Sequence, residues 1–271
     1  MPPQLTGAGQ NPSAARPSKE SDVKIAVCIK RVPDTEARIK VAGDGAGIDA
    51  AGVKFVVSPY DEFAVEHALR TKEAAEGGEV TVLTVGESAS GEQLRAALAM
   101  GADRAVLLKG QPTLDGLATA KALAAELKEG GYDLVLLGMK AMDDDNQQVG
   151  PMLGELMERP CVTVVHDFEL VDGGVVAHRE IEGGAEVVEV PLPAILTMTK
   201  GEFEPRYPSL KGIMAAKKKP LEEKDAALGE CRVEVRGYTP PPERPAGRIV
   251  GEGVDAVPEL VRALREEARV L

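Results

Sequence analysis

Short apolar runs that alternate with segments of helical periodicity are the feature that most constrains how this chain folds. We predict buried strands at 24–29, 79–85, 105–109 and 133–138, and helices at 59–75, 89–101, 115–129 and 147–158. Strands buried on both faces, alternating with amphipathic helices, are typical of a parallel sheet with right-handed crossovers. The sequence therefore predicts an α/β layer structure.

The pattern changes after Pro160. Gly-containing turns separate strand-like segments at 161–170, 175–181 and 185–190, which predicts antiparallel hairpins, and 194–199 reads as a last buried strand. We divide the chain into a disordered tail (1–22), an α/β domain (23–220) and a C-terminal arm (221–271) with a helix from about Val257. The arm has too little apolar surface for its own core and is expected to pack on this domain or on a partner.

Charge and cysteine content exclude several function classes. The 271 residues include 32 Lys and Arg against 44 Asp and Glu, a net charge of −12, which disfavours nucleic acid and anionic membrane surfaces as partners. No stretch approaches the ~18 uncharged apolar residues that membrane insertion requires. Three cysteines without a CxxC pair, no secretory signal and three histidines without ligand spacing predict a cytoplasmic protein with no metal site.

Ser58-Pro59-Tyr60-Asp61 follows the apolar stretch 55–57 and has the form of a helix N-cap with a capping box. A well-started helix would be a sufficient explanation. A helix N-terminus at the end of a strand also presents free N–H groups to an anion. The motif alone does not decide between these interpretations.

The segment 138–150 follows a predicted strand and precedes a predicted helix, which is where ligands bind in open α/β sheets. Its three consecutive acids could bind Mg²⁺ or cap the next helix. Its Asn-Gln-Gln run and the N–H groups of 146–149 suit a phosphate, with the acids turned aside. Nucleotide binding, helix capping and a metal site all remain open on the residues alone.

The segment 202–214 combines apolar residues with Pro and Gly and is followed by three lysines. It is either a surface loop with a solvated basic run or a protein-docking element with apolar anchors. The chain has no GxGxxG, GxxxxGK[ST] or GxSxG motif and no supported nucleophile pair. Nothing in these residues therefore indicates a self-contained catalyst.

Six segments between residues 24 and 220 carry a collinear likeness to a known family: KIAVCIKRVPDTEARI, SPYDEFAVEHALR, LRAALAMGADRAVLL, DLVLLGMKAMDDDNQQVG, REIEGG and EPRYPSLKGIMAAKKKP. Together they resemble the beta subunit of electron transfer flavoproteins. The resemblance implies a doubly wound α/β domain of the adenine-nucleotide-binding type, paired with a separate alpha subunit. In that family the alpha subunit holds most of the FAD, and the beta subunit binds AMP, or a second FAD in electron-bifurcating members.

The resemblance also implies partners. The heterodimer takes electrons from flavin dehydrogenases such as acyl-CoA dehydrogenases, as in fatty acid β-oxidation, and passes them to a quinone oxidoreductase or a similar acceptor. It would lie in the mitochondrial matrix if the source is eukaryotic. The implied nucleotide site comprises Cys28, Ser58, Pro59, Tyr60, Asp61, Val85, Gly138, Met139, Lys140, Ala141, Met142, Asp143, Asp144, Asp145, Asn146, Gln147, Gln148 and Val149. The implied partner-recognition set comprises Arg179, Glu180, Arg206, Tyr207, Leu210, Ile213, Met214, Lys217, Lys218 and Lys219.

Within this set, Leu210 matches the family's apolar anchor in a recognition loop at 200–219. The sequence departs from ordinary members at Ser58, where Asn is usual, and at Thr35, where many have Tyr. Bifurcating members favour a Gly and a Thr inside the acidic loop, where this chain has Asp144 and Asn146. Side chains that fill that space favour AMP over a second FAD. A stress-type nucleotide-binding protein without redox function is the alternative from another class.

Overall fold

The computed structural model describes residues 23–75, 77–111, 115–243 and 246–271, so the predicted tail at 1–22 lies outside the described residues. The chain forms two units. The larger contains residues up to Ile39 and Asp49–Arg236, and the smaller contains Lys40–Ile48 and Gly237–Leu271. None of the helices within these described ranges is long and apolar enough to cross a membrane.

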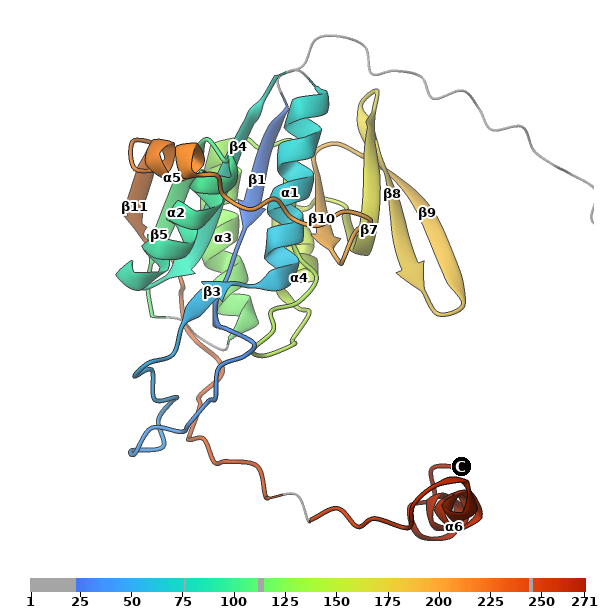
Figure 1. The fold of residues 1–271 in the computed structure, drawn as a ribbon. Helices are drawn as coiled ribbons and strands as arrows, with labels where there is room; N and C mark the ends of the chain where they lie inside the picture. The colour runs from blue at the N-terminus through green and yellow to red at the C-terminus, as the bar shows by residue number, and fades with distance from the viewer. Residues whose placement is uncertain (1–22, 76, 112–114, 244–245) are drawn as a thin grey trace, which may run out of the picture. The chain divides into compact units, whose positions relative to one another are not determined.

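Within the described residues, the larger unit is built on a nine-stranded sheet in the order β11-β5-β4-β1-β6-β10-β7-β8-β9 (Figure 1). The strands are β1 (Lys24–Cys28), β4 (Glu79–Gly86), β5 (Arg104–Lys109), β6 (Leu134–Gly138), β7 (Cys161–Val171), β8 (Gly174–Ile181), β9 (Gly184–Pro191), β10 (Ala194–Met198) and β11 (Leu221–Asp225). All neighbours from β11 to β7 pair in parallel, whereas β7, β8 and β9 pair antiparallel. The predicted mostly parallel sheet with an added hairpin region is confirmed.

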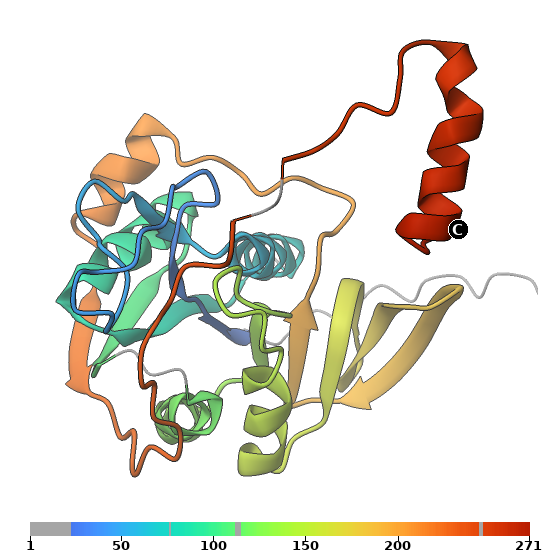
Figure 2. The same cartoon turned by 90° about the horizontal axis from the view of Figure 1, so that it is seen from below.

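Helices cover both faces of this sheet (Figure 2). One face carries α1 (Pro59–Ala74), α2 (Gly91–Met100) and α5 (Leu210–Ala216), and the other carries α3 (Gly116–Gly130) and α4 (Val149–Met157). Successive side chains of β1 point to opposite faces of the sheet. Ile25 and Val27 belong to the core under α1 and α2, whereas Ala26 and Cys28 belong to the core under α3 and α4. This double coverage explains why the parallel strands are apolar throughout.

The sheet reverses its direction of growth at β1. The chain moves from β1 to β4 and β5 on one side, and then crosses to β6 on the other side. Ligands of doubly wound sheets bind at such a switch point, outside the carboxyl ends of the strands. Cys28 and Gly138 end the two strands at this point. A short antiparallel pair, β2 (Arg31–Pro33) with β3 (Phe55–Val57), follows β1 and leads into α1.

Two segments differ from the sequence-based expectation. Residues 221–225 form β11 beside β5, so the chain leaves the larger unit at Arg236, not at residue 220. The recognition segment, expected to be irregular because of its Pro and Gly, contains α5, whose N-cap Ser209 accepts a hydrogen bond from Gly212 N at 3.0 Å. Gly212 permits this helix because a side chain there would collide with the Ala99 carbonyl of α2.

In the smaller unit, Tyr238 N donates to Gly45 O at 2.8 Å, which joins its two chain segments, and Val41 bridges Ile48 within the first of them. The predicted C-terminal helix begins at Val257 as α6 (Val257–Arg262) and continues as a π-helical turn, Ala263–Glu267. Ile249 and Val254 are both 85% exposed, so this unit leaves apolar surface uncovered.

Candidate functional site

A pocket of about 160 Å³ lies at the carboxyl ends of β1 and β6, at the switch point of the sheet. The starts of α1 and α4 and the first turns of α3 surround it. Its lining comprises Cys28, Ile29, Lys30, Arg31, Asp61, Val85, Ser90, Thr119, Leu123, Leu137, Gly138, Met139, Lys140, Ala141, Gln147, Gln148, Val149 and Gly150. The two sequence segments predicted to form one site, 58–61 and 138–149, therefore meet.

Asp61 ties the start of α1 to the end of β6 and to the residues that follow β1. Its Oδ2 accepts from Lys30 N at 2.7 Å, and its Oδ1 accepts from Gly138 N at 2.8 Å. Gly138 is required for this approach, because a Cβ there would lie 2.5 Å from Asp61 Oδ1. Burial raises the pKa of Asp61 to about 7 even though both backbone donors favour its charged form.

The capping box predicted at Ser58 is wrong in its bonding, although Ser58 is the N-cap residue of α1. The Ser58 side chain makes no cap hydrogen bond, and the Asp61 carboxylate bonds the two strands and does not turn back to Ser58 N, which donates to Lys30 O. Among the described residues, the buried Ser58 Oγ has no hydrogen-bond partner. The Asp61 carboxylate, which a capping box would use, accepts hydrogen bonds from Lys30 N and Gly138 N instead.

Lysines neutralise the three consecutive acids of the loop after β6. Lys30 Nζ lies 2.8 Å from Asp143 Oδ1 and 2.9 Å from Asp144 Oδ2, and Lys140 Nζ lies 2.9 Å from Asp145 Oδ2. Burial lowers the pKa of Lys30, but hydrogen bonds to the two aspartates outweigh burial and raise it above its ordinary value. The acids are thus turned to lysines, as the phosphate interpretation of this loop requires.

The helices around the pocket differ in how their N-termini are closed. Asp115 caps α3, because its Oδ1 accepts from Leu117 N at 3.0 Å and from Ala118 N at 3.2 Å. Neither Ser58 of α1 nor Gln148 of α4 makes a side-chain cap bond. Helix N-terminal N–H groups need a partner, so these two helix starts are suited to an anionic ligand.

The structure brings about half of the predicted nucleotide site to the pocket wall. Ten predicted residues line it: Cys28, Asp61, Val85, Gly138, Met139, Lys140, Ala141, Gln147, Gln148 and Val149. Eight lie beside it or in the outer loop: Ser58, Pro59, Tyr60, Met142, Asp143, Asp144, Asp145 and Asn146. Burial raises the pKa of the Cys28 thiol to about 12, so this cysteine stays protonated.

Sequence reasoning missed four polar residues of the pocket: Lys30, Arg31, Ser90 and Thr119. Lys30 directly follows a buried strand, and Ser90 and Thr119 lie at the starts of helices that follow strands. Those positions were the available signal, because the carboxyl ends of parallel strands share one edge of the sheet. No motif marked them.

The recognition segment presents its apolar residues to solvent. Tyr207 is 94% exposed, Leu210 80%, Met214 59% and Ile213 46%. Lys217 and Lys218 are also exposed. Single exposed apolar residues are ordinary, but four within eight positions form the kind of patch that marks an interaction surface.

Three predicted recognition residues make intramolecular bonds. Lys219 Nζ donates to Leu98 O and Ala102 O at the end of α2, and Arg206 binds acidic residues of α1. On β8, toward the other end of the strand order from α5, Arg179 pairs with Glu186 at 3.3 Å, and Glu180 is exposed. The structure therefore does not bring Arg179 and Glu180 together with the α5 residues.

The fold and pocket define a doubly wound α/β protein of the class that holds its ligand at a topological switch point. The electron transfer flavoprotein domain family matches residues 46–228. The chain is 41% identical over 249 residues to the electron transfer flavoprotein subunit beta of Bradyrhizobium diazoefficiens, covering 92% of this chain and all of that protein. The chain therefore belongs to the electron transfer flavoprotein family, among its beta subunits.

Two further relatives show the range of this likeness. A mitochondrial electron transfer flavoprotein subunit beta from Oryza sativa subsp. indica is 40% identical over 258 residues, covering 92% of this chain and all of that protein. The caffeyl-CoA reductase-Etf complex subunit CarD of Acetobacterium woodii is 37% identical over 260 residues, covering 90% of this chain and 99% of that protein.

Proposed function

We propose that this chain pairs with an electron transfer flavoprotein alpha subunit, binds AMP in the switch-point pocket and docks flavin dehydrogenases such as acyl-CoA dehydrogenases. The heterodimer then passes the electrons to a quinone oxidoreductase or a similar acceptor. The beta-subunit names of the relatives support the alpha partner. The proposed location is the cytoplasm, or the mitochondrial matrix in a eukaryote.

The uncapped starts of α1 and α4 at one pocket are the observation that carries the nucleotide proposal. α3, which begins beside them, has its N-terminus closed by Asp115. The buried Ser58 hydroxyl without a partner in the described residues is a second group that a ligand would satisfy. A phosphate at α4 and ribose or base groups near Ser58 and Asp61 fit these donors and acceptors.

AMP fits better than a second FAD. The pocket of about 160 Å³ is small for a dinucleotide. Side chains at Asp144 and Asn146 occupy the acidic loop, where a diphosphate would need room.

The test of this choice is to denature the purified heterodimer and to quantify the released nucleotides. We expect about one AMP per chain, as one nucleotide in the switch-point pocket implies. Release of a second FAD per heterodimer, with no AMP, would contradict AMP binding and support the electron-bifurcating alternative. The likeness to the caffeyl-CoA reductase-Etf subunit favours that alternative.

In this proposal the residues of this chain position the bound cofactors and shield them from solvent. They make and break no covalent bonds themselves. A bound FAD supplies the one-electron and two-electron chemistry, and it is expected mainly in the alpha subunit. The Cys28 thiol is buried and protonated, which removes it as a nucleophile. Asp61 holds two backbone N–H groups and so positions α1.

The exposed patch around Leu210 supports dehydrogenase docking. We expect Leu210→Ala to raise the KM for the carrier in its reduction by an acyl-CoA dehydrogenase by about tenfold, since buried anchors dominate such interfaces. Flavin content should not change. Val171→Ala, which shortens a 40% exposed side chain at the end of β7, is the matched control. An unchanged KM for Leu210→Ala would remove Leu210 as the anchor.

The alternative from another class is a nucleotide-binding protein without redox function. A flavin absorbance spectrum of the co-purified complex distinguishes the two. The proposed carrier is yellow, whereas a stress-type protein binds nucleotide without a flavin partner.

A further inference from the structure

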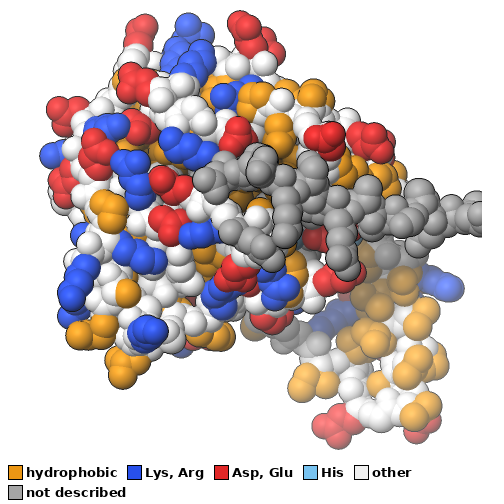
Figure 3. All heavy atoms as spheres, turned by 90° about the horizontal axis from the view of Figure 1, so that it is seen from above, with side chains coloured by type: hydrophobic (Ala, Val, Ile, Leu, Met, Phe, Trp, Pro, Cys, Tyr) orange, Lys and Arg blue, Asp and Glu red, His pale blue; other side chains and the backbone are white. Residues whose placement is uncertain are grey.

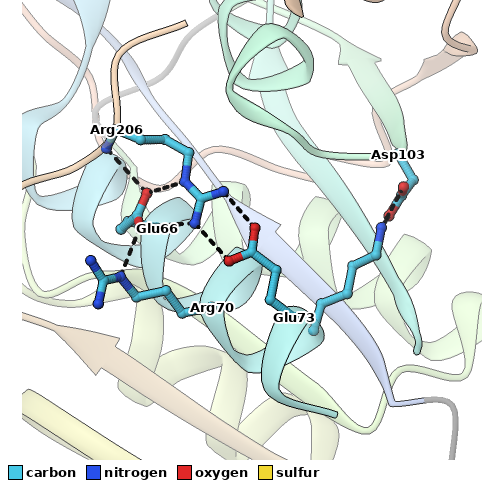
Figure 4. Close-up of polar contacts among 6 residues, drawn as sticks. Glu66, Arg70, Glu73, Asp103 and Arg206 are labelled. Carbon is cyan, nitrogen blue, oxygen red and sulfur yellow. Dashed lines mark hydrogen bonds and ion pairs between the residues drawn. The ribbon is translucent and has the colours of Figure 1, made fainter. Parts of the chain in front are cut away.

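Arg206 is the centre of an ion-pair network that joins the segment before α5 to α1 (Figure 4). Its Nε donates to Glu66 Oε2 at 2.7 Å, and its terminal nitrogens reach Glu66 Oε1 at 3.0 Å and the Glu73 carboxylate at 2.6 and 3.1 Å. Arg206 N adds a backbone bond to Glu66 Oε2 at 3.1 Å. One guanidinium thus binds two carboxylates spaced seven residues apart along one face of α1.

Glu66 is built to receive this arginine. Its side chain is only 2% exposed, and it also accepts from Arg70 Nε at 2.8 Å. Burial alone would raise the pKa of Glu66, but hydrogen bonds from Arg206 and Arg70 outweigh burial and lower the pKa below its ordinary value. The buried Glu66 carboxylate accepts four hydrogen bonds. It holds its donors firmly, because the loss of one donor would leave a buried charge unpaired.

The same network reaches a second residue of the segment. The Arg70 guanidinium lies 3.9 Å from the ring centre of Phe203, and that ring packs edge-on against His67 with a centroid distance of 4.5 Å. Residues 203 and 206 are therefore both fixed on α1. Tyr207, the next residue along the chain, is 94% exposed.

The far end of the segment is fixed on another helix. Arg95 of α2 donates from NH1 to Ala216 O at 2.7 Å and to Lys219 O at 2.8 Å, and Lys219 Nζ bonds Leu98 O and Ala102 O. The exposed residues from Tyr207 to Met214 thus lie between two anchored ends. Such an arrangement holds an interaction surface in one conformation before a partner arrives, which reduces the entropy lost on binding.

We propose that Arg206 is a positioning residue for partner docking: through Glu66 and Glu73 it holds Tyr207 and Leu210 in the geometry that the dehydrogenase recognises. This inference rests on the proposed docking function of the Leu210 patch. Arg206 contacts α1 and acts through the segment, so its loss affects recognition of the dehydrogenase and leaves flavin chemistry unchanged.

The test uses the flavin-loaded heterodimer, an acyl-CoA dehydrogenase with its substrate as electron donor, and dithionite as a donor that needs no docking. Arg206→Met removes both ion pairs, and Glu73→Gln removes only the outer pair while the buried Glu66 pair keeps the fold. Glu204→Gln is the matched control, because Glu204 lies in the same segment and pairs only with Lys200 in the described ion pairs, at 3.5 Å on the surface.

We expect Arg206→Met to raise the KM for the carrier by about tenfold and Glu73→Gln by about threefold, with kcat, flavin content and dithionite reduction unchanged. Arg206→Lys should fall between them, since an ammonium cannot bind two carboxylates bidentately. If Leu210→Ala raises KM but Arg206→Met and Glu73→Gln match Glu204→Gln, the positioning role is overturned and docking stands. If Leu210→Ala also leaves KM unchanged, the docking function itself fails.

Discussion

At the scale of residues, burial without a compensating hydrogen bond changes the ionisation of His67. His67 is 4% exposed and packs against Phe168 and Phe203, with ring centroids 5.5 and 4.5 Å away. Among the described residues, its Nε2 has no hydrogen-bond partner. Burial lowers the pKa of His67 from 6.5 to about 4, so the imidazole is neutral in the folded protein at neutral pH.

This shift predicts a pH dependence of stability. Between pH 6.5 and 4 the unfolded chain binds a proton at His67 and the folded chain does not, so the free energy of unfolding falls as the pH falls. The loss from this residue is at most about 3 kcal/mol and is complete below the folded pKa. Urea unfolding at several pH values should show a smaller loss in His67→Phe over this window. Equal losses in the two proteins would contradict a buried neutral His67.

At the scale of elements, the helices that border the pocket start in two different ways. α3 is closed by Asp115, which also accepts from Arg232 N at 2.6 Å and so ties the chain after β11 to this helix. α1 starts with Ser58, whose hydroxyl makes no cap bond. A side chain therefore closes the start of α3, whereas the Ser58 hydroxyl at the start of α1 has no hydrogen-bond partner among the described residues.

We therefore predict opposite outcomes for two helix-start substitutions. Asp115→Ala should lower the free energy of unfolding by about 1–3 kcal/mol, because it removes a cap and leaves backbone N–H groups without a partner. Ser58→Ala should change stability by less than about 0.5 kcal/mol but lower the AMP retained on purification. Denaturant midpoints and nucleotide content measure both effects. If Ser58→Ala lowers the free energy of unfolding and leaves the AMP content unchanged, Ser58 stabilises the fold and does not bind the nucleotide.

At the scale of the whole molecule, the larger unit has a core on each face of its sheet, whereas the described residues of the smaller unit belong to neither core. Both hydrophobic clusters consist of residues of the larger unit. Its visible face in Figure 3 mixes acidic and basic side chains where they are described, with no single basic patch. The smaller unit exposes Ile249, Val254 and Leu260. We infer that the smaller unit serves association and contributes little to folding of the sheet.

A chain that ends at Arg236 tests this inference. We expect its thermal midpoint as an isolated chain to match that of the full chain within a few degrees, because the sheet and its helices are intact. Its association with the co-expressed alpha subunit should be weakened at least about tenfold, since the exposed apolar surface of residues 237–271 is lost. Full-strength association of the truncated chain would show that this unit is not part of the interface.

Much of the fold could be predicted because its signals are local. The helix from Pro59 and the strand at 133–138 follow from periodicity within one window, and the structure places them within a residue or two. β11 escaped prediction because LEEKD is an edge strand with charged side chains, which has no apolar pattern. α5 escaped because Pro208 and Gly212 resemble loop residues, whereas packing on α2 makes that glycine necessary.

The candidate site could be predicted only to the level of its segments. The sequence indicated that 58–61 and 138–149 belong to one ligand, and both lie at the pocket. It could not show that Asp61 bonds two strands instead of capping α1, or that Lys30 holds the acidic loop. Those bonds compete with local alternatives of similar energy, and only the assembled sheet decides between them.

The sequence by itself determined the order and type of the main elements, the α/β class and the likeness to electron transfer flavoprotein beta subunits, because periodicity and segment identity are properties of short stretches. Tertiary structure alone decided that Gly138 N meets Asp61 across 77 residues and that Glu66 meets Arg206 across 140 residues. Such contacts depend on closing long loops, whose entropy is offset only when the whole core forms. The polar groups that shape the pocket and hold the docking segment therefore become defined only in the folded chain.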